Sequence, residues 1–159
     1  VYDLAITFND EDIKRKSLYN LSYYSMYGKY YDDAITYANQ VIGMNCFVTK
    51  CHYILAWSYM GLGIFSKANE HYQLLKKLNK HDDFIVDGYE KCIKYRLASK
   101  NDSYYKALVN LYKKLYNKIY TFDKVMVLEY ILEYCDQHEL YEEGYMYQKE
   151  LLKILQKNH

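Results

Sequence analysis

The sequence predicts an all-α protein built from consecutive antiparallel helix pairs, and three observations lead to that prediction. The 159-residue chain contains no proline and only six glycines, so few residues interrupt helices and short turns must join them. Hydrophobic residues make up 51% and charged residues 26%, which suits a chain with a sizeable core and excludes a disordered one. The third observation is an internal repeat, which favours one repetitive domain over residues 1–159.

The repeat is clearest between two segments of similar pattern. In each, a leucine followed by a small residue leads to a glycine, an aromatic residue and an alanine. Three residue pairs recur at the same interval of 34 residues: Leu21 and Leu55, Tyr31 and Phe65, Ala34 and Ala68. A small residue lets two helices approach closely, an aromatic ring fills the space between them, and a glycine permits the turn. The pattern therefore predicts two helix pairs of one design, with both alanines buried between paired helices.

Two later segments repeat the pattern less closely. Ala107 follows Ala68 after 39 residues, and Gly144 takes the alanine position 37 residues further on. Their first helices lack the leucine–small pair. These two repeats are therefore predicted from the length of the segments and the helical period of their apolar residues. The four predicted repeats cover residues 10–46, 47–81, 82–119 and 120–157.

Eight helices follow, taken in chain order. They are expected at residues 10–27, 31–44, 48–61, 65–79, 84–99, 103–118, 122–137 and 140–157. Asn9 precedes three acidic residues and is expected to cap the first of these helices, with residues 1–8 ending a preceding one. The apolar residues of 149–157 fit either a polar helix that closes the array or a homodimer face, and we expect the closing helix.

Charge and cysteine usage exclude several classes of protein. The 21 basic and 20 acidic residues leave a net charge of +1, so we expect neither a nucleic acid nor a membrane surface as partner. No apolar run approaches the roughly 20 residues that a membrane span needs. The four cysteines show no Cys-x-x-Cys spacing and are expected to be buried free thiols, which favours a cytoplasmic location.

No constellation of reactive residues predicts an enzyme. No two histidines have the i, i+4 spacing of a helical zinc site, and no glycine-rich phosphate loop is present. Cys51 and His52 are adjacent, but neighbouring residues on a helix point about 100° apart and cannot easily form a nucleophile–base pair. We therefore expect no catalytic residue, no metal and no cofactor.

The leucine–small pairs at 21–22 and 55–56, together with Gly63, Phe65 and Ala68, resemble the tetratricopeptide-repeat family. The resemblance implies a right-handed superhelical solenoid of about four repeats whose concave surface is lined by the first helices. The family holds peptides on that surface, beside the leucine–small pair. Carried over to this sequence, the peptide groove comprises Tyr19, Asn20, Tyr23, Tyr53, Trp57 and Arg96. The alternative for each aromatic residue is packing between neighbouring helices.

Within that family, the composition rich in Tyr, Lys and Asn and the drifting repeat length resemble the peptide-pheromone-responsive regulators of Gram-positive bacteria, the Rgg, Rap, NprR and PlcR group. This resemblance implies a sensing domain that binds a short signalling peptide and regulates transcription. The family's carboxylate clamp uses Lys, Asn and Arg where this sequence has mostly aromatics, which argues against a co-chaperone. The alternative function is a constitutive scaffold for protein assembly.

Overall fold

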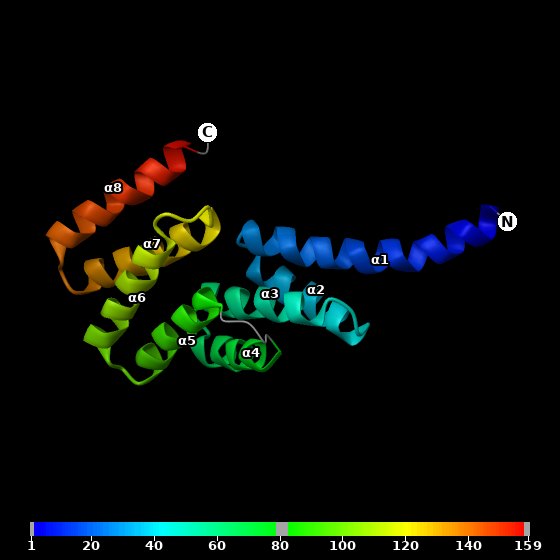
Figure 1. Ribbon diagram of the computed structural model, residues 1–159, viewed down its shortest axis with the longest axis horizontal. Coiled ribbons are helices and arrows are strands. Elements are labelled where there is room, and N and C mark those ends of the chain that lie inside the picture. Colours follow the sequence, from blue (N-terminus) through cyan, green and yellow to red (C-terminus); the bar gives the residue numbers. More distant parts are fainter. Residues whose placement is uncertain (1, 79–82, 158–159) are drawn as a thin grey trace. The chain divides into compact units, whose positions relative to one another are not determined.

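Eight α-helices account for nearly all of the structure in the computed structural model, which describes residues 2–78 and 83–157 (Figure 1). No strand occurs within those two ranges. The helices are α1 Tyr2–Tyr27, α2 Tyr31–Gly43, α3 Val48–Gly61, α4 Phe65–Leu78, α5 Phe84–Leu97, α6 Asn101–Leu115, α7 Thr121–Gln137 and α8 Tyr141–Lys157. Within those ranges the predicted all-helical fold class is confirmed, and α2 to α8 begin and end within about three residues of their predicted limits.

The start of α1 differs from the prediction. The helix runs without a break from Tyr2 to Tyr27, so Asn9 lies inside it, and the predicted cap at this residue is wrong. No proline or glycine occurs in this stretch, so nothing obliges the backbone to leave the helix. The acidic residues Asp10 to Asp12 simply occupy an exposed part of the helix surface.

The turn within each helix pair has the same backbone geometry in all four pairs. The second residue after the first helix adopts a left-handed conformation: Lys29 (φ 66°), Gly63 (φ 78°), Ser99 (φ 56°) and Glu139 (φ 56°). The next amide donates to a carbonyl five residues back: Tyr30 to Ser25 (2.7 Å), Ile64 to Tyr59 (2.9 Å), Lys100 to Tyr95 (3.0 Å) and Leu140 to Cys135 (2.9 Å). This is the Schellman arrangement, which satisfies the last carbonyls of a helix. The backbone therefore repeats even where the side-chain pattern does not.

The chain comprises two compact units, residues 1–86 and 87–159, and each is described by itself. In the first unit α1 packs against both α2 and α3, and α3 packs in turn against α2 and α4. Ala34 and Ala68 are fully buried, as predicted. Leu55 and Ala56 are also buried, whereas Leu21 is 44% exposed and only its neighbour Ser22 lies in the core.

In the second unit α7 packs against α6 and α8. Gly88 of α5 lies so close to Leu111 of α6 that a Cβ atom added to the glycine would overlap the leucine side chain. The absence of a side chain at Gly88 therefore sets how closely these helices approach. The core of this unit includes Tyr89, Ile93, Leu108, Leu111, Leu115, Leu128 and Ile131. No described helix of either unit has both the length and the hydropathy needed to cross a lipid bilayer.

Candidate functional site

Two of the predicted groove residues lie together on α1. The ring of Tyr19 stacks on Phe47, with centroids 4.8 Å apart and an angle of 18° between the planes. Tyr23 is 6.3 Å from Tyr19 between ring centroids and 4.6 Å from Tyr27. Burial, and then the nearby Cys51 and Tyr23, raise the pKa of Tyr19. Tyr19 is thus half-buried against the turn that precedes α3, and Tyr23 is 38% exposed beside it.

A second aromatic pair lies on α3. Tyr53 and Trp57 stack with centroids 5.1 Å apart, and both rings are half-buried. The hydroxyl of Tyr53 donates a hydrogen bond of 2.6 Å to Asp83, whose other carboxylate oxygen accepts the amides of Ile85 (3.0 Å) and Val86 (3.4 Å). Asp83 therefore caps the start of α5, and Tyr53 holds the capping carboxylate in place.

Tyr89 repeats this arrangement one helix pair later. Its hydroxyl donates a 2.8 Å hydrogen bond to Asp123 in the first turn of α7, and both residues are buried. Tyr53 follows Tyr19 after 34 residues, and Tyr89 follows Tyr53 after 36. In all three cases the tyrosine contacts the beginning of the next first helix. The hydroxyl of Tyr53 thus contributes to packing between helices, which is the alternative to peptide binding that the sequence left open. The rings of Trp57 and Tyr23 remain partly exposed.

The other two predicted residues differ from these aromatic pairs. Asn20 is exposed on α1. Arg96 belongs to the second unit, where its guanidinium carbon lies 5.4 Å from the ring centroid of Tyr104. Burial of Tyr104 raises its pKa, so the ring stays neutral and offers its face to the cation. Ring contacts therefore join Tyr19 to Tyr23 and Tyr53 to Trp57.

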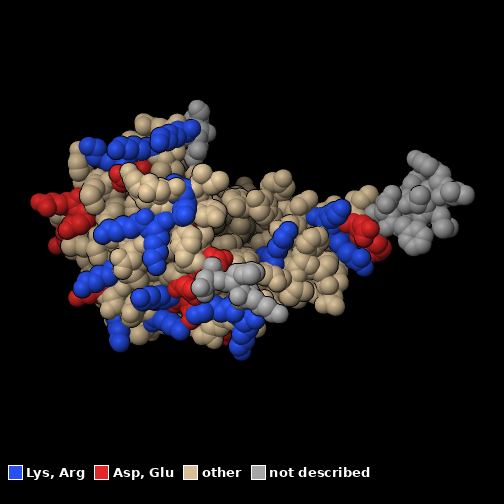
Figure 2. All heavy atoms as spheres, viewed as in Figure 1, with Lys and Arg blue, Asp and Glu red and all other residues tan. Residues whose placement is uncertain are grey.

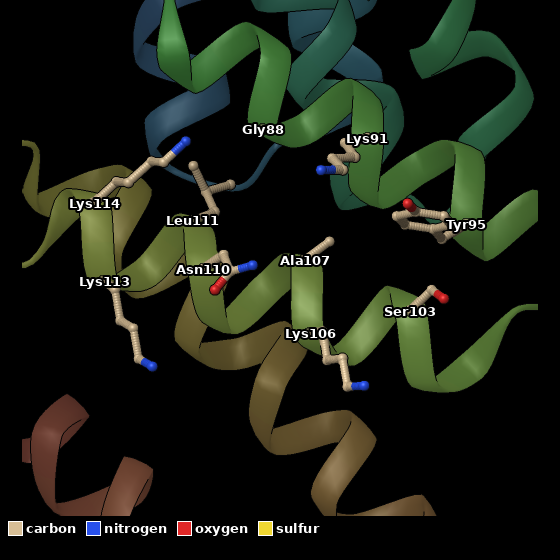
Figure 3. Close-up of a pocket in the computed structure, with 10 residues that line it drawn as sticks. All are labelled: Gly88, Lys91, Tyr95, Ser103, Lys106, Ala107, Asn110, Leu111, Lys113 and Lys114. Atoms are coloured by element: carbon tan, nitrogen blue, oxygen red, sulfur yellow. The ribbon is translucent and has the colours of Figure 1, made fainter.

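A groove between α5 and α6 has several lysines in its lining; in Figure 3, Lys91 and Lys114 point towards the space between the two helices, whereas Lys106 and Lys113 point away from it. The groove has a volume of about 410 Å³ and is lined by Gly88, Lys91, Tyr95, Ser103, Lys106, Ala107, Asn110, Leu111, Lys113 and Lys114. Four of these ten residues are lysines and none is acidic. Gly88 and Ala107 line the groove where the two helices come close together. Such a groove favours carboxylate or other anionic groups.

A second groove, between α7 and α8, has the opposite charge. Its volume is about 630 Å³, and its lining includes Glu129, Glu133 and Asp136 without any lysine or arginine. Tyr141 and Tyr145 form part of its other wall. The two grooves of the second unit thus differ in charge, although each is formed by a helix pair with the same turn.

An unpredicted polar contact joins α3 to α4. The Nδ1 atoms of His52 and His71 are 3.0 Å apart, so the two rings share a proton in one hydrogen bond. The ring of Tyr59 stacks on His71 at 5.6 Å between centroids. Burial lowers the pKa of both histidines, and for His71 the neighbouring His52 adds to this effect. Their separation of 19 residues follows no helical spacing, so only the packing of the two helices brings them together.

The geometry offers no nucleophile in this region. Cys51 is fully buried, and burial raises its pKa to about 11, which disfavours the reactive thiolate. His52 bonds to His71 rather than to its neighbour Cys51. Over the part of the chain that the structure describes, no three His, Cys, Asp or Glu side chains come together as metal ligands. Comparison of the chain with family models, curated proteins and solved structures found no match.

Proposed function

We propose that this chain is a non-catalytic module that binds a short peptide or protein segment, built as a tetratricopeptide-like superhelix of four helix pairs. The observation that carries the proposal is the row of partly exposed aromatic rings on the first helices, with Tyr23 on α1 and Trp57 on α3. Aromatic side chains are enriched where proteins bind peptides, because they supply a large contact area at little entropic cost. The proposal assigns no catalytic residue, metal or cofactor to the chain.

The repeated turn supports the repeat architecture. Four helix pairs with the same left-handed residue and the same backwards hydrogen bond are four copies of one hairpin. Stacked hairpins each contact only their neighbours and present a continuous surface formed by their first helices. In the first unit α1 and α3 are in direct contact, which is the neighbour relation that such stacking requires.

In its specific form, the proposal makes the chain the sensing domain of a cytoplasmic transcription regulator that responds to a signalling peptide. Binding would then favour one of two conformations by its difference in affinity for them. Independently of those rings, the lysines between α5 and α6 of the second unit form a surface suited to acidic groups. A constitutive scaffold is the alternative, in which the same aromatic surface holds a partner protein permanently.

Trp57 allows a direct test, because it is the only tryptophan in the chain. A library of short synthetic peptides, some apolar and some acidic, is titrated into the protein while tryptophan fluorescence is recorded. We expect a saturable change for a subset of peptides. For those peptides, Trp57→Ala followed by calorimetry should lose about 2 kcal/mol of binding free energy, as expected for a buried anchor.

The matched control is Tyr30→Ala, which removes a 67%-exposed ring from the turn after α1 and should leave affinity unchanged. Should Trp57→Ala lower the melting temperature while peptide affinity stays the same, the aromatic rings serve packing alone. A scaffold is distinguished from a sensor by hydrogen exchange with and without the peptide, because only a sensor changes protection in helices remote from the ligand.

A further inference from the structure

The helix pair α5–α6 is strongly basic for a chain that is nearly neutral as a whole. Between residues 84 and 115 the chain has seven basic and three acidic residues, although its net charge is only +1. In Figure 2, basic side chains predominate over the part of the second unit where Figure 1 places α5 and α6. Most acidic residues of this unit belong instead to α7 and α8. The positive charge is therefore concentrated on one helix pair.

The acidic residues of this helix pair do not neutralise the lysines of its groove. Glu90 pairs with Lys94, one turn further along α5, at 2.6 Å. Asp102 faces α7, because burial, and then the charge of Asp102 and a hydrogen bond to it, raise the pKa of Tyr134. With the residues that the structure describes, no ion pair is formed by the four groove lysines Lys91, Lys106, Lys113 and Lys114. Their charge is thus left for a ligand.

Neutral hydrogen-bond donors accompany the lysines. Tyr95 and Ser103 are half-buried in the groove lining, and Asn110 lies in it between them and Lys114. Figure 3 shows Tyr95 between the two helices, which also have Lys91 and Lys114 directed into that space. A hydroxyl, an amide and an ammonium group can all donate to a carboxylate oxygen. The lining therefore combines charge and donors suited to an anionic ligand.

The spacing of the lysines indicates the form of that ligand. Lys106 and Lys114 are eight residues apart on α6, which is roughly 12 Å along the helix. A single small anion can contact only one end of such a row. An extended peptide places every second side chain on the same side at intervals of about 6.6 Å, so alternate acidic residues can reach both ends.

We propose that the α5–α6 groove binds a short, extended acidic segment of a partner protein. The groove lining runs along α6 from Ser103 to Lys114, roughly 16 Å, which corresponds to about five extended residues. Carboxylates at alternate positions of that segment lie near the lysines, and Tyr95 and Asn110 donate to them or to the peptide backbone.

Phosphate-bearing ligands fit the groove less well. Arginine, whose planar group binds phosphate through two hydrogen bonds, does not occur in the lining, and Tyr95 is its only aromatic residue. Single-stranded nucleic acids bind to rows of aromatic side chains on which successive bases stack. A long polyanion would also be repelled by the acidic groove that α7 and α8 form in the same unit.

The acidic segment and the proposed ligand of the aromatic rings occupy different surfaces. The rings of Tyr23 and Trp57 belong to α1 and α3 of the first unit, and Arg96 of α5 does not line the groove. The two proposals therefore stand or fall separately. Because the lysines are exposed, we expect weak binding that decreases as salt screens the charges.

The test is an NMR titration of the chain with the peptide Glu-Ser-Glu-Ser-Glu, blocked at both termini. We expect saturable shifts of backbone amides that centre on Lys91, Tyr95 and Asn110. The neutral peptide Gln-Ser-Gln-Ser-Gln should cause no such shifts. Raising the salt concentration from roughly 50 to 300 mM should weaken binding of the acidic peptide several-fold.

A pair of double variants tests the lysines. Lys91→Gln combined with Lys114→Gln should weaken binding roughly five- to tenfold, because each removes one charge directed into the groove. The matched control combines Lys118→Gln with Lys149→Gln, which removes the same charge from exposed positions of the same unit outside the lining. This control should bind as the wild type does. Circular dichroism shows whether each variant is folded.

A charge reversal separates recognition from loss of structure. Lys91→Glu combined with Lys114→Glu should lose the acidic peptide and bind Lys-Ser-Lys-Ser-Lys instead, which an unfolded chain would not do at these positions. Trp57→Ala should leave affinity for the acidic peptide unchanged. A loss of that affinity in Trp57→Ala would contradict the separation of the two surfaces.

Three results would overturn the proposal. One is the absence of saturable shifts with the acidic peptide, or equal shifts with the neutral one. Another is unchanged affinity in the variant that lacks both Lys91 and Lys114. The third is displacement of the peptide by inorganic phosphate or by a short oligothymidylate at equal or lower concentration, which would assign the groove to phosphate groups.

Discussion

The two units share a backbone design but present different surfaces. Each contains two helix pairs closed by the same left-handed turn, and each has a tyrosine in one first helix that donates to an aspartate at the start of another. On the first unit, partly exposed rings such as Tyr23 and Trp57 dominate the candidate surface. The second unit instead has one groove lined by lysines and one lined by acids.

Residues that hold a helix pair together therefore differ from those that form its surface. Ala68 and Ala107 occupy corresponding places in their second helices. Ala68 is fully buried, but Ala107 is 8% exposed and lines the lysine groove. The same small residue is thus fully enclosed in one unit, whereas in the other it borders a groove.

The largest expected effect tests this difference directly. Ala68→Glu would bury a carboxylate among apolar side chains and should cost about 4 kcal/mol or more, enough to unfold the first unit. Ala107→Glu should cost only about 1 kcal/mol, because its carboxylate can reach the groove and its lysines. Thermal unfolding followed by circular dichroism measures both. Equal melting temperatures for the two variants would show that the two alanines do not differ as described.

The next effect concerns the tyrosine–aspartate hydrogen bonds. Tyr89→Phe removes a donor from the buried Asp123 and should cost about 2 kcal/mol. Tyr53→Phe should cost about 1 kcal/mol or less, because Asp83 is only half-buried and keeps the amides of Ile85 and Val86. Urea denaturation gives the two free energies of unfolding. A larger loss for Tyr53→Phe would contradict the difference in burial.

Smaller changes are expected at two helical glycines of the second unit. Gly88→Ala would force Leu111 aside and should cost about 1 kcal/mol despite the better helix propensity of alanine. At Gly144 an added Cβ would meet Cys135 at an ordinary 3.5 Å, so Gly144→Ala should stabilise by about 0.5–1 kcal/mol. Opposite shifts in melting temperature are the expected result. Stabilisation by both substitutions would show that the approach of α5 and α6 is not limiting.

The smallest effect is a dependence on pH that belongs to the first unit. Because the folded state lowers the pKa of His52 and His71, the unfolded chain binds more protons near pH 6.5. Stability should therefore be constant at neutral pH and fall as the pH drops through 6.5 towards the folded pKa values. Lys67 and Glu70 lie on the same helix as His71 and act on it with opposite signs.

His71→Gln should make the melting temperature less dependent on pH between about 5 and 7. The control is His138→Gln, which changes an exposed histidine of the second unit and should leave the pH profile as it is. An unchanged profile for His71→Gln would mean that the histidine pair does not govern the acid sensitivity.

The sequence predicted the helices well because their limits depend on local chemistry. Chain breakers are few, and the apolar positions of α2, α4, α6 and α8 follow a helical period. The start of α1 was mispredicted because a capping residue followed by acids only permits a helix to begin there. Whether the helix extends further towards the N-terminus depends on the preceding residues, which contain no breaker.

The candidate site was less accessible from the sequence. Tyr19, Tyr53 and Tyr89 recur at intervals of 34 and 36 residues, a signal that could have identified the links between first helices. Their partners, such as Asp123 for Tyr89, depend on how those helices pack. In the sequence, the lysines of the α5–α6 groove cannot be distinguished from ordinary solvent-exposed lysines. Only the packing of the two helices places them in the lining of one groove. The pairing of His52 with His71 likewise requires tertiary structure.

The left-handed turns have a consequence for engineering. Only the second helix pair has a glycine at that position, and the others place Lys29, Ser99 and Glu139 there. A residue with a Cβ atom costs roughly 1 kcal/mol or more in this conformation. Replacing it by glycine should therefore stabilise each of the three hairpins. Glycine at all three places should raise the melting point additively, since the turns are far apart in sequence and share no partner in their hydrogen bonds. The chain thus offers a route to a more robust scaffold in which Tyr23, Trp57 and every lysine of the α5–α6 groove remain unaltered.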